Sequence, residues 1–430
     1  METVRIKPAK SLKGEIRVPG DKSISHRAVM LASISEERSV IKGFLSAGDT
    51  LRTVKAFENM GIKVEGAGTD NLIIGGKGLD GLREPEDILD LGNSGTSMRL
   101  LTGLLSGQRF FSVLTGDDSL RKRPMKRVTV PLRQMGAKIN GRDDAGFAPL
   151  AIKGRTLKPI EYDSPVPSAQ VKSSILLAGL YAEGETKVKE PGKSRDHTER
   201  MLMAFGADLK EFDLTVSIKG RPALKARDIV VPGDFSSAAF FIVAGILVPD
   251  SEVIIKNVGV NPTRTGLLDI LKRMKAEIHL ENLRDIGGEP MADISVKSGH
   301  LGGAEIKGNE ILKAIDEFPI ICVAASLSEG ETVIREAEDL RVKESDRISA
   351  MVKELRKMGV EIEEFPDGIR IKGRERLKGA VCNSHGDHRV AMAIAIAGLL
   401  ADRETVIEDT ECISTSFPGF IETLNGLRNG

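Results

Sequence analysis

The sequence predicts an α/β protein with two domains, each built from three copies of one βαβαββ unit. A pattern of two helices occurs six times in the 430 residues, at a spacing of about 70 residues, which suits a compact α/β unit rather than a solenoid repeat. Short segments that alternate Val or Ile with polar residues lie between the helices, as strands do.

The first helix of each copy is apolar and follows a turn of small polar or acidic residues. The six copies are Gly20–Ile34, Gly92–Leu105, Val166–Leu180, Gly233–Leu247, Asp316–Leu327 and His385–Leu400. A helix start carries exposed N–H groups and the positive end of the helix dipole. Six such starts could gather round one anionic ligand.

The second helix of each copy is amphipathic and breaks directly into a strand. The breaks lie at Met60–Val64, Met135–Ile139, Phe205–Leu209, Met274–Ile278 and Met358–Ile362, and a sixth copy starts at Phe420. A further strand follows at Asn71–Gly75, Ala148–Lys153, Leu214–Lys219, Asp293–Lys297 and Gly368–Lys372, bounded by Gly, Asp or Asn. Each complete copy therefore has the order β-α-β-α-β-β.

The sixth copy ends before its strands, and the N-terminus can supply them. Val4–Ile6 and Gly14–Val18 both have an extended pattern. We expect the first ~20 residues to join the C-terminal domain, because an incomplete sheet would leave an exposed edge. The predicted domains are 21–231, and 1–20 with 232–430.

Two tetrapeptides of sequence VPGD, Val18–Asp21 and Val231–Asp234, lie where the chain would cross between these domains. Pro followed by Gly suits a hinge. The same residues also suit an ordinary strand-to-helix turn. The residues leave both interpretations open, and their position at the predicted boundary favours the hinge.

Composition excludes several classes of protein. The chain has 62 basic and 62 acidic residues, no Trp and two Tyr, which argues against nucleic-acid and membrane-surface binding. Cys322, Cys382 and Cys412 lie too far apart for a CxxC metal pair or a disulfide framework. No signal peptide or membrane span is visible. We therefore expect a cytoplasmic, soluble protein without a metal site.

Residues able to bind anions lie at several helix starts. Lys22, Ser23 and Arg27 can share one face of a helix start, although for this motif alone a solvated basic turn with Ser23 as N-cap is the favoured interpretation. Gly95 would let the backbone approach a ligand, or would simply belong to a well-capped helix. Arg123, fixed by the proline after it, is a candidate bidentate anion clamp within a run that is usually a solvated face.

Later helix starts also carry polar or charged residues. Ser168–Gln170 opens an apolar helix, and His197 heads a companion helix as a predicted capping or surface histidine. Asp316 starts the fifth apolar helix, and Asp387–Arg389 starts the sixth. The run Arg341–Arg347 alternates in charge, which is also typical of a salt-bridged helix start. Charged residues at five of the six starts exceed what capping alone requires.

The segments GDKSISHR, GNSGTSMR, RKRPM, PSAQVKSS, SRDHTE, IDEFP, RVKESDR, GDHR and STSFPGF together resemble the 5-enolpyruvylshikimate-3-phosphate (EPSP) synthase family, over essentially the whole chain. The resemblance implies a two-domain inside-out α/β barrel, with three βαβαββ units per domain and two crossover strands as the hinge. It implies transfer of the carboxyvinyl group of phosphoenolpyruvate to the 5-hydroxyl of 3-phosphoshikimate, with release of phosphate. The reaction belongs to aromatic amino-acid biosynthesis and needs no metal or organic cofactor. We also expect a monomer.

The resemblance assigns the site residues. Those for 3-phosphoshikimate are Lys22, Ser23, Arg27, Ser168, Ala169, Gln170, Arg195, Asp316 and Lys343. Those for phosphoenolpyruvate are Lys22, Gly95, Arg123, Gln170, Arg347 and Arg389. The catalytic groups are Asp316 as base for the attacking hydroxyl, Glu344 as acid toward the vinyl carbon, and Lys22. Which of the three moves which proton stays open.

The chain departs from the family pattern in one segment. Several members carry Lys before the Phe-Pro pair, whereas Ser414–Pro418 is STSFP. The sequences RVKESDR and SAQ are those of the often glyphosate-tolerant branch, while Gly95 is associated with the sensitive branch, so inhibitor sensitivity stays open.

Two other functions compete with this interpretation. UDP-N-acetylglucosamine 1-carboxyvinyltransferase shares the fold and chemistry but uses a Cys in a mobile loop, and Thr115–Pro124 has none. A non-enzymatic protein of the same repeat fold, binding an anionic ligand or an RNA end, would be expected to carry more basic and aromatic residues.

Overall fold

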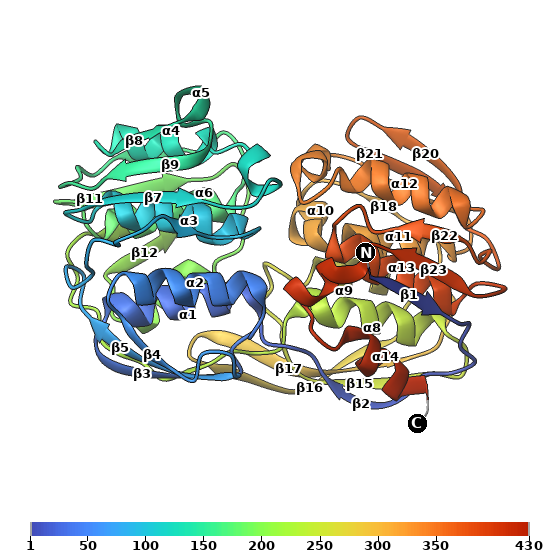
Figure 1. The fold of residues 1–430 in the computed structure, drawn as a ribbon. Coiled ribbons are helices and arrows are strands. Elements are labelled where there is room, and N and C mark those ends of the chain that lie inside the picture. Colours follow the sequence, from blue (N-terminus) through green and yellow to red (C-terminus); the bar gives the residue numbers. More distant parts are fainter. Residues whose placement is uncertain (1, 429–430) are drawn as a thin grey trace. The chain divides into compact units, whose positions relative to one another are not determined.

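The computed structural model describes residues 2–428, which form two compact units (Figure 1). The N-terminal unit comprises Gly20–Val231 and Ile286–Glu289. The C-terminal unit comprises, within the described residues, 2–19, 232–285 and 290–428.

The N-terminal unit contains the first half of the repeated pattern. Its helices are α1 (Lys22–Ile34), α2 (Gly48–Asn59), α3 (Gly95–Ser106), η1 (Leu120–Lys122), α4 (Lys126–Gln134), α5 (Arg142–Ala145), α6 (Ala169–Gly179) and α7 (His197–Ala204). Its strands are β3 (Glu36–Lys42), β4 (Lys63–Glu65), β5 (Asn71–Lys77), β6 (Leu89–Asp90), β7 (Phe111–Thr115), β8 (Lys138–Gly141), β9 (Phe147–Lys153), β10 (Glu161–Asp163), β11 (Glu185–Lys189), β12 (Leu209–Phe212), β13 (Thr215–Lys219) and β14 (Ile229–Val230).

The C-terminal unit contains the second half. Its helices are α8 (Phe235–Leu247), α9 (Gly266–Arg273), α10 (Asn309–Lys313), η2 (Ile315–Glu317), α11 (Phe318–Ser326), η3 (Glu338–Val342), α12 (Arg347–Lys357), α13 (His388–Leu399), η4 (Thr410–Thr415) and α14 (Phe420–Arg428). Its strands are β1 (Thr3–Ile6), β2 (Lys13–Arg17), β15 (Glu252–Gly259), β16 (Ile278–Ile286), β17 (Glu289–Lys297), β18 (Glu305–Ile306), β19 (Glu331–Ile334), β20 (Glu361–Phe365), β21 (Gly368–Lys372), β22 (Val381–Asn383) and β23 (Thr405–Glu408).

The strands form six separate sheets, three in each unit. The orders are β14-β3-β5-β4, β6-β7-β9-β8 and β10-β11-β13-β12 in the N-terminal unit, and β16-β17-β15-β2, β18-β19-β21-β20 and β1-β23-β22 in the C-terminal unit. In each sheet a short strand pairs in parallel with the strand that follows an apolar helix, and an antiparallel strand lies beyond it. The predicted α/β class is confirmed, and no sheet within residues 2–428 closes into a barrel.

The N-terminal strands differ from the prediction in one respect. Strand β1 pairs antiparallel with β23 and so joins the sheet of the sixth copy, as expected. Strand β2 instead pairs in parallel with β15, in the sheet of the fourth copy. Strand β14, which precedes α8, takes the corresponding place beside β3. The expectation that Gly14–Val18 completes the sixth copy was therefore wrong. Because β14 pairs with β3 in the N-terminal unit, the parallel position beside β15 is taken by β2.

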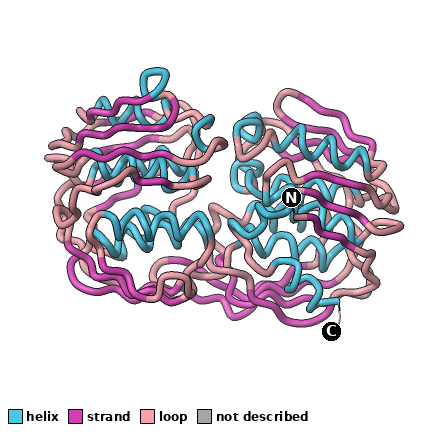
Figure 2. Tube along the Cα trace, in the orientation of Figure 1, coloured by secondary structure: helices cyan, strands magenta, loops and turns pink. Residues whose placement is uncertain are grey.

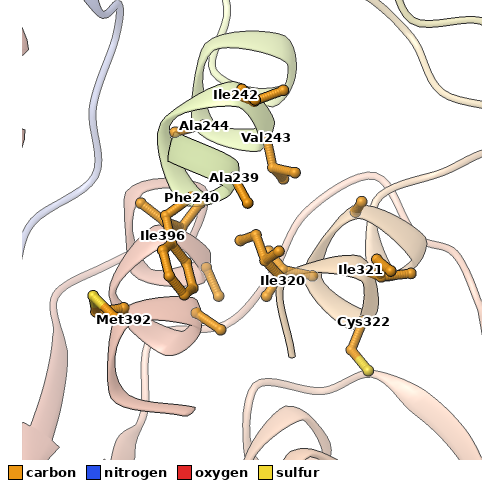
Figure 3. Close-up of a cluster of buried hydrophobic side chains, with 14 of the residues drawn as sticks. Ala239, Phe240, Ile242, Val243, Ala244, Ile320, Ile321, Cys322, Met392 and Ile396 are labelled. Atoms are coloured by element: carbon orange, nitrogen blue, oxygen red, sulfur yellow. The ribbon is translucent and has the colours of Figure 1, made fainter. Parts of the chain in front are cut away.

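The apolar helices form the core of each unit. In the C-terminal unit, α8, α11 and α13 pack side chains such as Phe240, Ile320 and Ile396 against one another (Figure 3). Helices α1, α3 and α6 are buried in the same way in the N-terminal unit. A helix that is apolar all round must be covered on every side. The strands alternate buried and exposed residues, so within each unit the apolar helices lie inside and the sheets lie further out (Figure 2).

The turns before the apolar helices are capping sequences. Side chains of Asp21, Ser94, Ser168, Asp234 and Asp387 accept hydrogen bonds from backbone N–H groups of the first turn. Helix α11 begins instead with a proline in its first turn.

The amphipathic helices end at a left-handed residue, which explains the repeated Met-Gly sequence. Gly61, Gly136, Gly206 and Gly359 have φ of 86°, 93°, 90° and 83°. Glycine adopts this conformation without steric cost. In the fourth copy Lys275 does so at a φ of 76°.

No helix of the described residues is long and apolar enough to cross a membrane.

Candidate active site

The start of α1 places the first predicted site residues. Asp21 is the N-cap, and its Oδ1 accepts a hydrogen bond from the Ile24 N–H at 2.8 Å. Lys22 and Ser23 are therefore the first two helical residues, and the alternative in which Ser23 caps the helix is wrong. The Lys22 ammonium lies 3.2 Å from Asp49 Oδ2 of α2, in a partly buried ion pair.

Arg27 lies one turn further along α1 and is buried rather than solvated. Its Nε donates to Thr198 Oγ1 (2.6 Å), its Nη2 to Ser173 Oγ (2.9 Å) and its Nη1 to the Ser23 carbonyl (2.9 Å). Burial lowers the pKa of Arg27 to about 10, and the nearby charge of Arg195 acts in the same direction. Arg27 remains a cation at neutral pH, surrounded mainly by neutral oxygens.

The start of α3 brings two arginines to one glycine. Gly95 is the first helical residue after the Ser94 cap. A Cβ at this position would lie 3.0 Å from Nη1 of both Arg123 and Arg99. Arg123 Nη2 donates to Asn93 Oδ1 at 2.6 Å, so the clamp arginine is fixed against the same turn. Gly95 and Arg123, which are expected to bind the same ligand, therefore lie at one turn.

Arg99 is a site residue that the sequence analysis did not select. Its Nη1 donates to Gln170 Oε1 (2.6 Å) and its Nη2 to the Pro124 carbonyl (3.3 Å). Gln170 Nε2 in turn donates to Thr96 Oγ1 at 3.1 Å. Arg99 therefore holds Gln170 of α6 against the start of α3. Its spacing of four residues from Gly95, on one helix face, is the signal that could have identified it.

A buried histidine joins α1 to α2 and α3. His26 Nδ1 lies 2.8 Å from Thr53 Oγ1 and 3.3 Å from Ser97 Oγ. Burial, followed by the charges of Lys22 and Arg27, lowers the pKa of His26 well below its usual value. The ring is therefore neutral and serves as a hydrogen-bonding link between helix starts.

The starts of α6 and α7 complete the group in the N-terminal unit. Ser168 caps α6, and its own N–H donates to Glu190 Oε1 at 2.9 Å. Ala169 and Gln170 are the first two residues of the helix. Arg195 precedes α7 and is partly exposed.

His197 is not the capping or surface histidine that the sequence predicted. It is buried at the start of α7, and its Nδ1 lies 2.7 Å from Glu289 Oε1. Arg200 Nη1 also donates to the Gly288 carbonyl at 2.8 Å. These contacts explain why the turn of the β16–β17 hairpin, Ile286–Glu289, groups with the N-terminal unit.

Three carboxylates of the C-terminal unit contact one buried arginine, Arg347, at the start of α12. Its Nε donates to Asp387 Oδ2 (2.8 Å), its Nη1 to Asp316 Oδ1 (3.2 Å) and its Nη2 to Glu344 Oε2 (2.6 Å). Burial acts to lower the pKa of Arg347, but the three carboxylates raise it overall. Arg347 thus brings both predicted catalytic carboxylates into one cluster.

Asp387 and Arg389 extend this cluster from α13. Burial acts to raise the pKa of Asp387, but the Arg347 guanidinium holds it below its usual range. Arg389 Nη2 lies 3.7 Å from Asp316 Oδ2, and its Nη1 donates to the Asp316 carbonyl at 3.3 Å. Lys343 precedes Glu344 at the end of η3. In the sequence Asp387 is only one residue of a charged triplet, whereas the structure shows that it anchors Arg347.

Metal coordination has no candidate among residues 2–428, since no group of three or more His, Cys, Asp or Glu side chains there is arranged to hold an ion.

The fold of the chain is that of a known class of enzymes. The enolpyruvyl transferase NikO of Streptomyces tendae matches it with a TM-score of 0.78, over 98% of this chain and 96% of that one. The two sequences are 18% identical, so this likeness shows the fold alone. The protein therefore has the enolpyruvyl transferase fold.

Closer relatives define the family. The model of EPSP synthase (3-phosphoshikimate 1-carboxyvinyltransferase) matches residues 6–424. The 3-phosphoshikimate 1-carboxyvinyltransferases of Citrifermentans bemidjiense and Geotalea uraniireducens are 58% identical over 427 residues and 60% identical over 424 residues, each covering 99% of both chains. The EPSP synthase structure from Acinetobacter baumannii is 47% identical, with a TM-score of 0.89 over 99% of this chain and 98% of that one. The chain belongs to the EPSP synthase family and is a transferase, so the predicted family and enzyme class are confirmed.

Proposed function

We propose that the protein transfers the carboxyvinyl group of phosphoenolpyruvate to the 5-hydroxyl of 3-phosphoshikimate and releases phosphate. This reaction belongs to the shikimate pathway of aromatic amino-acid biosynthesis. The observation that carries the proposal is the convergence of Arg27, Arg99, Arg123 and Gly95 on adjoining helix starts. The substrates bring two phosphates and two carboxylates, and a chain of zero net charge must gather its cations locally to bind them.

The binding assignments rest on the family resemblance and are supported by the contacts within each unit. We assign 3-phosphoshikimate to Lys22, Ser23, Arg27, Ser168, Ala169, Gln170, Arg195, Asp316 and Lys343. We assign phosphoenolpyruvate to Lys22, Gly95, Arg123, Gln170, Arg347 and Arg389. The link from Arg99 to Gln170 supports a role for Gln170 toward both ligands, since it adjoins the Gly95 turn as well as the start of α6.

The chemistry requires one group to accept a proton and another to donate one. Asp316 takes the proton of the 5-hydroxyl while that oxygen bonds to C2 of phosphoenolpyruvate, and Glu344 gives a proton to C3. The C2–O bond to phosphate then breaks, and loss of a proton from C3 restores the double bond. Lys22 and the arginines stabilise the phosphate as it leaves.

A phosphate-release assay tests the function. We expect release with 3-phosphoshikimate plus phosphoenolpyruvate, and none with either substrate alone. UDP-N-acetylglucosamine plus phosphoenolpyruvate is the control for the alternative transferase. Release with the control pair alone would overturn the proposal, as would no release with any pair.

We further infer that residues 21–231, and 1–20 with 232–430, act as two domains of three βαβαββ units each, hinged at Val18–Asp21 and Val231–Asp234. The boundaries of the two compact units at Pro19/Gly20 and Val231/Pro232 support this division. If the hinge closes on ligands, both substrates together should reduce the radius of gyration in solution scattering. An unchanged radius of gyration would contradict hinge closure. The monomeric state, the cytoplasmic location and the absence of nucleic-acid binding stay predictions.

A further inference from the structure

A buried lysine near the start of α6 has no role in the assignments above. Lys172 Nζ lies 2.7 Å from Glu190 Oε2 and 2.7 Å from Glu199 Oε1. The three side chains are 1%, 3% and 0% exposed. Burying charges is costly unless they are paired and hydrogen-bonded, so this triad needs an explanation.

The two carboxylates of the triad differ in what else they contact. Glu190 Oε1 accepts the Ser168 N–H at 2.9 Å, and Glu190 Oε2 accepts the Ser194 hydroxyl at 2.9 Å. The Glu199 carboxylate pairs with Lys172, and among residues 2–428 it makes no hydrogen bond to either of these serines. One carboxylate therefore ties two loops together, and the other balances charge.

The two loops tied by Glu190 both carry proposed ligands of 3-phosphoshikimate. Ser168 opens α6 ahead of Ala169 and Gln170. Ser194 precedes Arg195 and the start of α7. A carboxylate that accepts one donor from each loop fixes the distance between them, because one of these hydrogen bonds is buried and the other is partly buried, where such bonds are stronger than in water.

The two carboxylates keep Lys172, the partner of Glu190, charged and in place. Burial acts to lower the pKa of Lys172, but Glu199 and Glu190 raise it overall, so the lysine stays charged. Glu199 also stabilises the charged form of Arg27. Glu199 thus interacts with two cations, Lys172 and Arg27.

We propose that Glu190, anchored by Lys172, is a positioning residue that holds the Ser168–Gln170 turn and the Ser194–Arg195 turn at the spacing required by 3-phosphoshikimate. This inference rests on the proposed function. It assigns Glu190 no contact with substrate and no step in the chemistry.

The test compares Glu190→Gln with Glu199→Gln. The substitution is the same, both residues are buried, and both contact the same lysine at the same distance. At Glu190 an amide keeps one acceptor oxygen. At the Oε2 position this oxygen leaves the Ser168 N–H without its acceptor, and at the Oε1 position it turns the amide N–H₂ group toward the Lys172 ammonium, so the link between the loops is disturbed either way.

We expect Glu190→Gln to raise the KM for 3-phosphoshikimate roughly 10-fold, because one or two hydrogen bonds of a charged acceptor are lost. The KM for phosphoenolpyruvate and kcat should stay within about 2-fold, since the chemistry is untouched. Glu199→Gln should raise the KM for 3-phosphoshikimate clearly less than Glu190→Gln does, because Glu199 bonds to neither loop, and should leave the other two constants within about 2-fold. Equal effects of both variants, or an unchanged KM in Glu190→Gln, would overturn the proposal.

Two measurements keep the test decisive. If Glu190→Gln does not fold, Ser194→Ala removes only the hydroxyl contact and should raise the same KM about 3-fold; no rise would count against the proposal. If wild-type protein shows no turnover, the proposed function fails, and amide hydrogen exchange decides the positioning role. Exchange in residues 166–171 and 193–197 should then be faster in Glu190→Gln than in Glu199→Gln.

Discussion

The two units each bury an arginine at the proposed site, and the two arginines have opposite surroundings. Arg27 is 5% exposed and bonds to two hydroxyls and a backbone carbonyl. Arg347 is 1% exposed and bonds to three carboxylates. Burial lowers the pKa of the first, and the carboxylates raise the pKa of the second. The two arginines therefore have the same chemistry in opposite electrostatic environments.

The difference indicates what each arginine is for. Residues 2–428 use three of the five N–H donors of Arg27, so its charge and two donors remain for an anionic ligand. Arg347 is already surrounded by more negative charge than it carries. Its main effect is to fix Asp316 and Glu344 in place, and an anionic substrate must compete with them for its donors.

The largest expected effect comes from removing an acid from the Arg347 cluster. Asp316→Ala should lower kcat by roughly 10²–10⁴-fold, because the attacking hydroxyl loses its base. Single-turnover kinetics with both substrates measures the change. Asp316→Asn is the control, since it keeps an oxygen for Arg347 and Arg389 but cannot take a proton. A near-normal rate in Asp316→Asn would show that the carboxylate only orients the arginines.

Asp387→Asn should break the Arg347 cluster at its anchor. Removing one partner of a buried ion pair costs about 3–5 kcal/mol of unfolding free energy. Asp346→Asn is the matched control, because Asp346 also caps its helix but pairs with the partly exposed Arg341, where a loss below about 1 kcal/mol is expected. Denaturant unfolding measures both. Equal losses of unfolding free energy in the two variants would contradict the distinction between a buried and a partly exposed ion pair.

The same ion pair predicts a dependence of stability on pH. The folded-state pKa of Asp387 lies below its usual range because of Arg347, against the opposing effect of burial. The stability that it contributes is therefore complete above about pH 4, the unfolded-state value, and is lost as the pH falls through the folded-state pKa. Wild-type protein should lose stability in this acid range more steeply than Asp387→Asn. Parallel curves of unfolding free energy against pH for the two proteins would show that the Asp387–Arg347 pair contributes nothing to stability.

Arg27→Gln should test the other side of the comparison. Losing charge-assisted hydrogen bonds to a phosphate should raise the KM for 3-phosphoshikimate roughly 10–100-fold. Ser173→Ala, which removes one neutral acceptor of Arg27, should raise it by less than about 5-fold. Steady-state kinetics separates the two. If Ser173→Ala had the larger effect, Arg27 would be a structural residue instead of a ligand.

The sequence predicts the repeat, the apolar helices and the helix breaks because each depends on local patterning. Apolar runs and Met-Gly breaks are visible without tertiary structure, and so are the charged helix starts. Pairing of strands distant in sequence is not, which is why β2 was expected beside the sixth copy and lies beside β15.

The residues that the sequence analysis overlooked act through other side chains. Glu190 contacts Ser168 and Ser194, and Asp387 contacts Arg347. Only the folded chain brings such pairs together. His197 was misjudged for the same reason, since its partner Glu289 is 92 residues away.

The smallest expected effect comes from adding one methyl group beside the arginines of α3. In Gly95→Ala the new Cβ would lie 3.0 Å from Nη1 of Arg123 and Arg99, so both guanidinium groups must shift slightly. We expect the KM for phosphoenolpyruvate to rise about 3–10-fold, a cost of roughly 1 kcal/mol. Gly48→Ala is the matched control, because Gly48 also begins a helix and a Cβ there meets no atom within 4 Å. An equal change in both variants would mean that helix propensity, and not displacement of the two arginines, causes it.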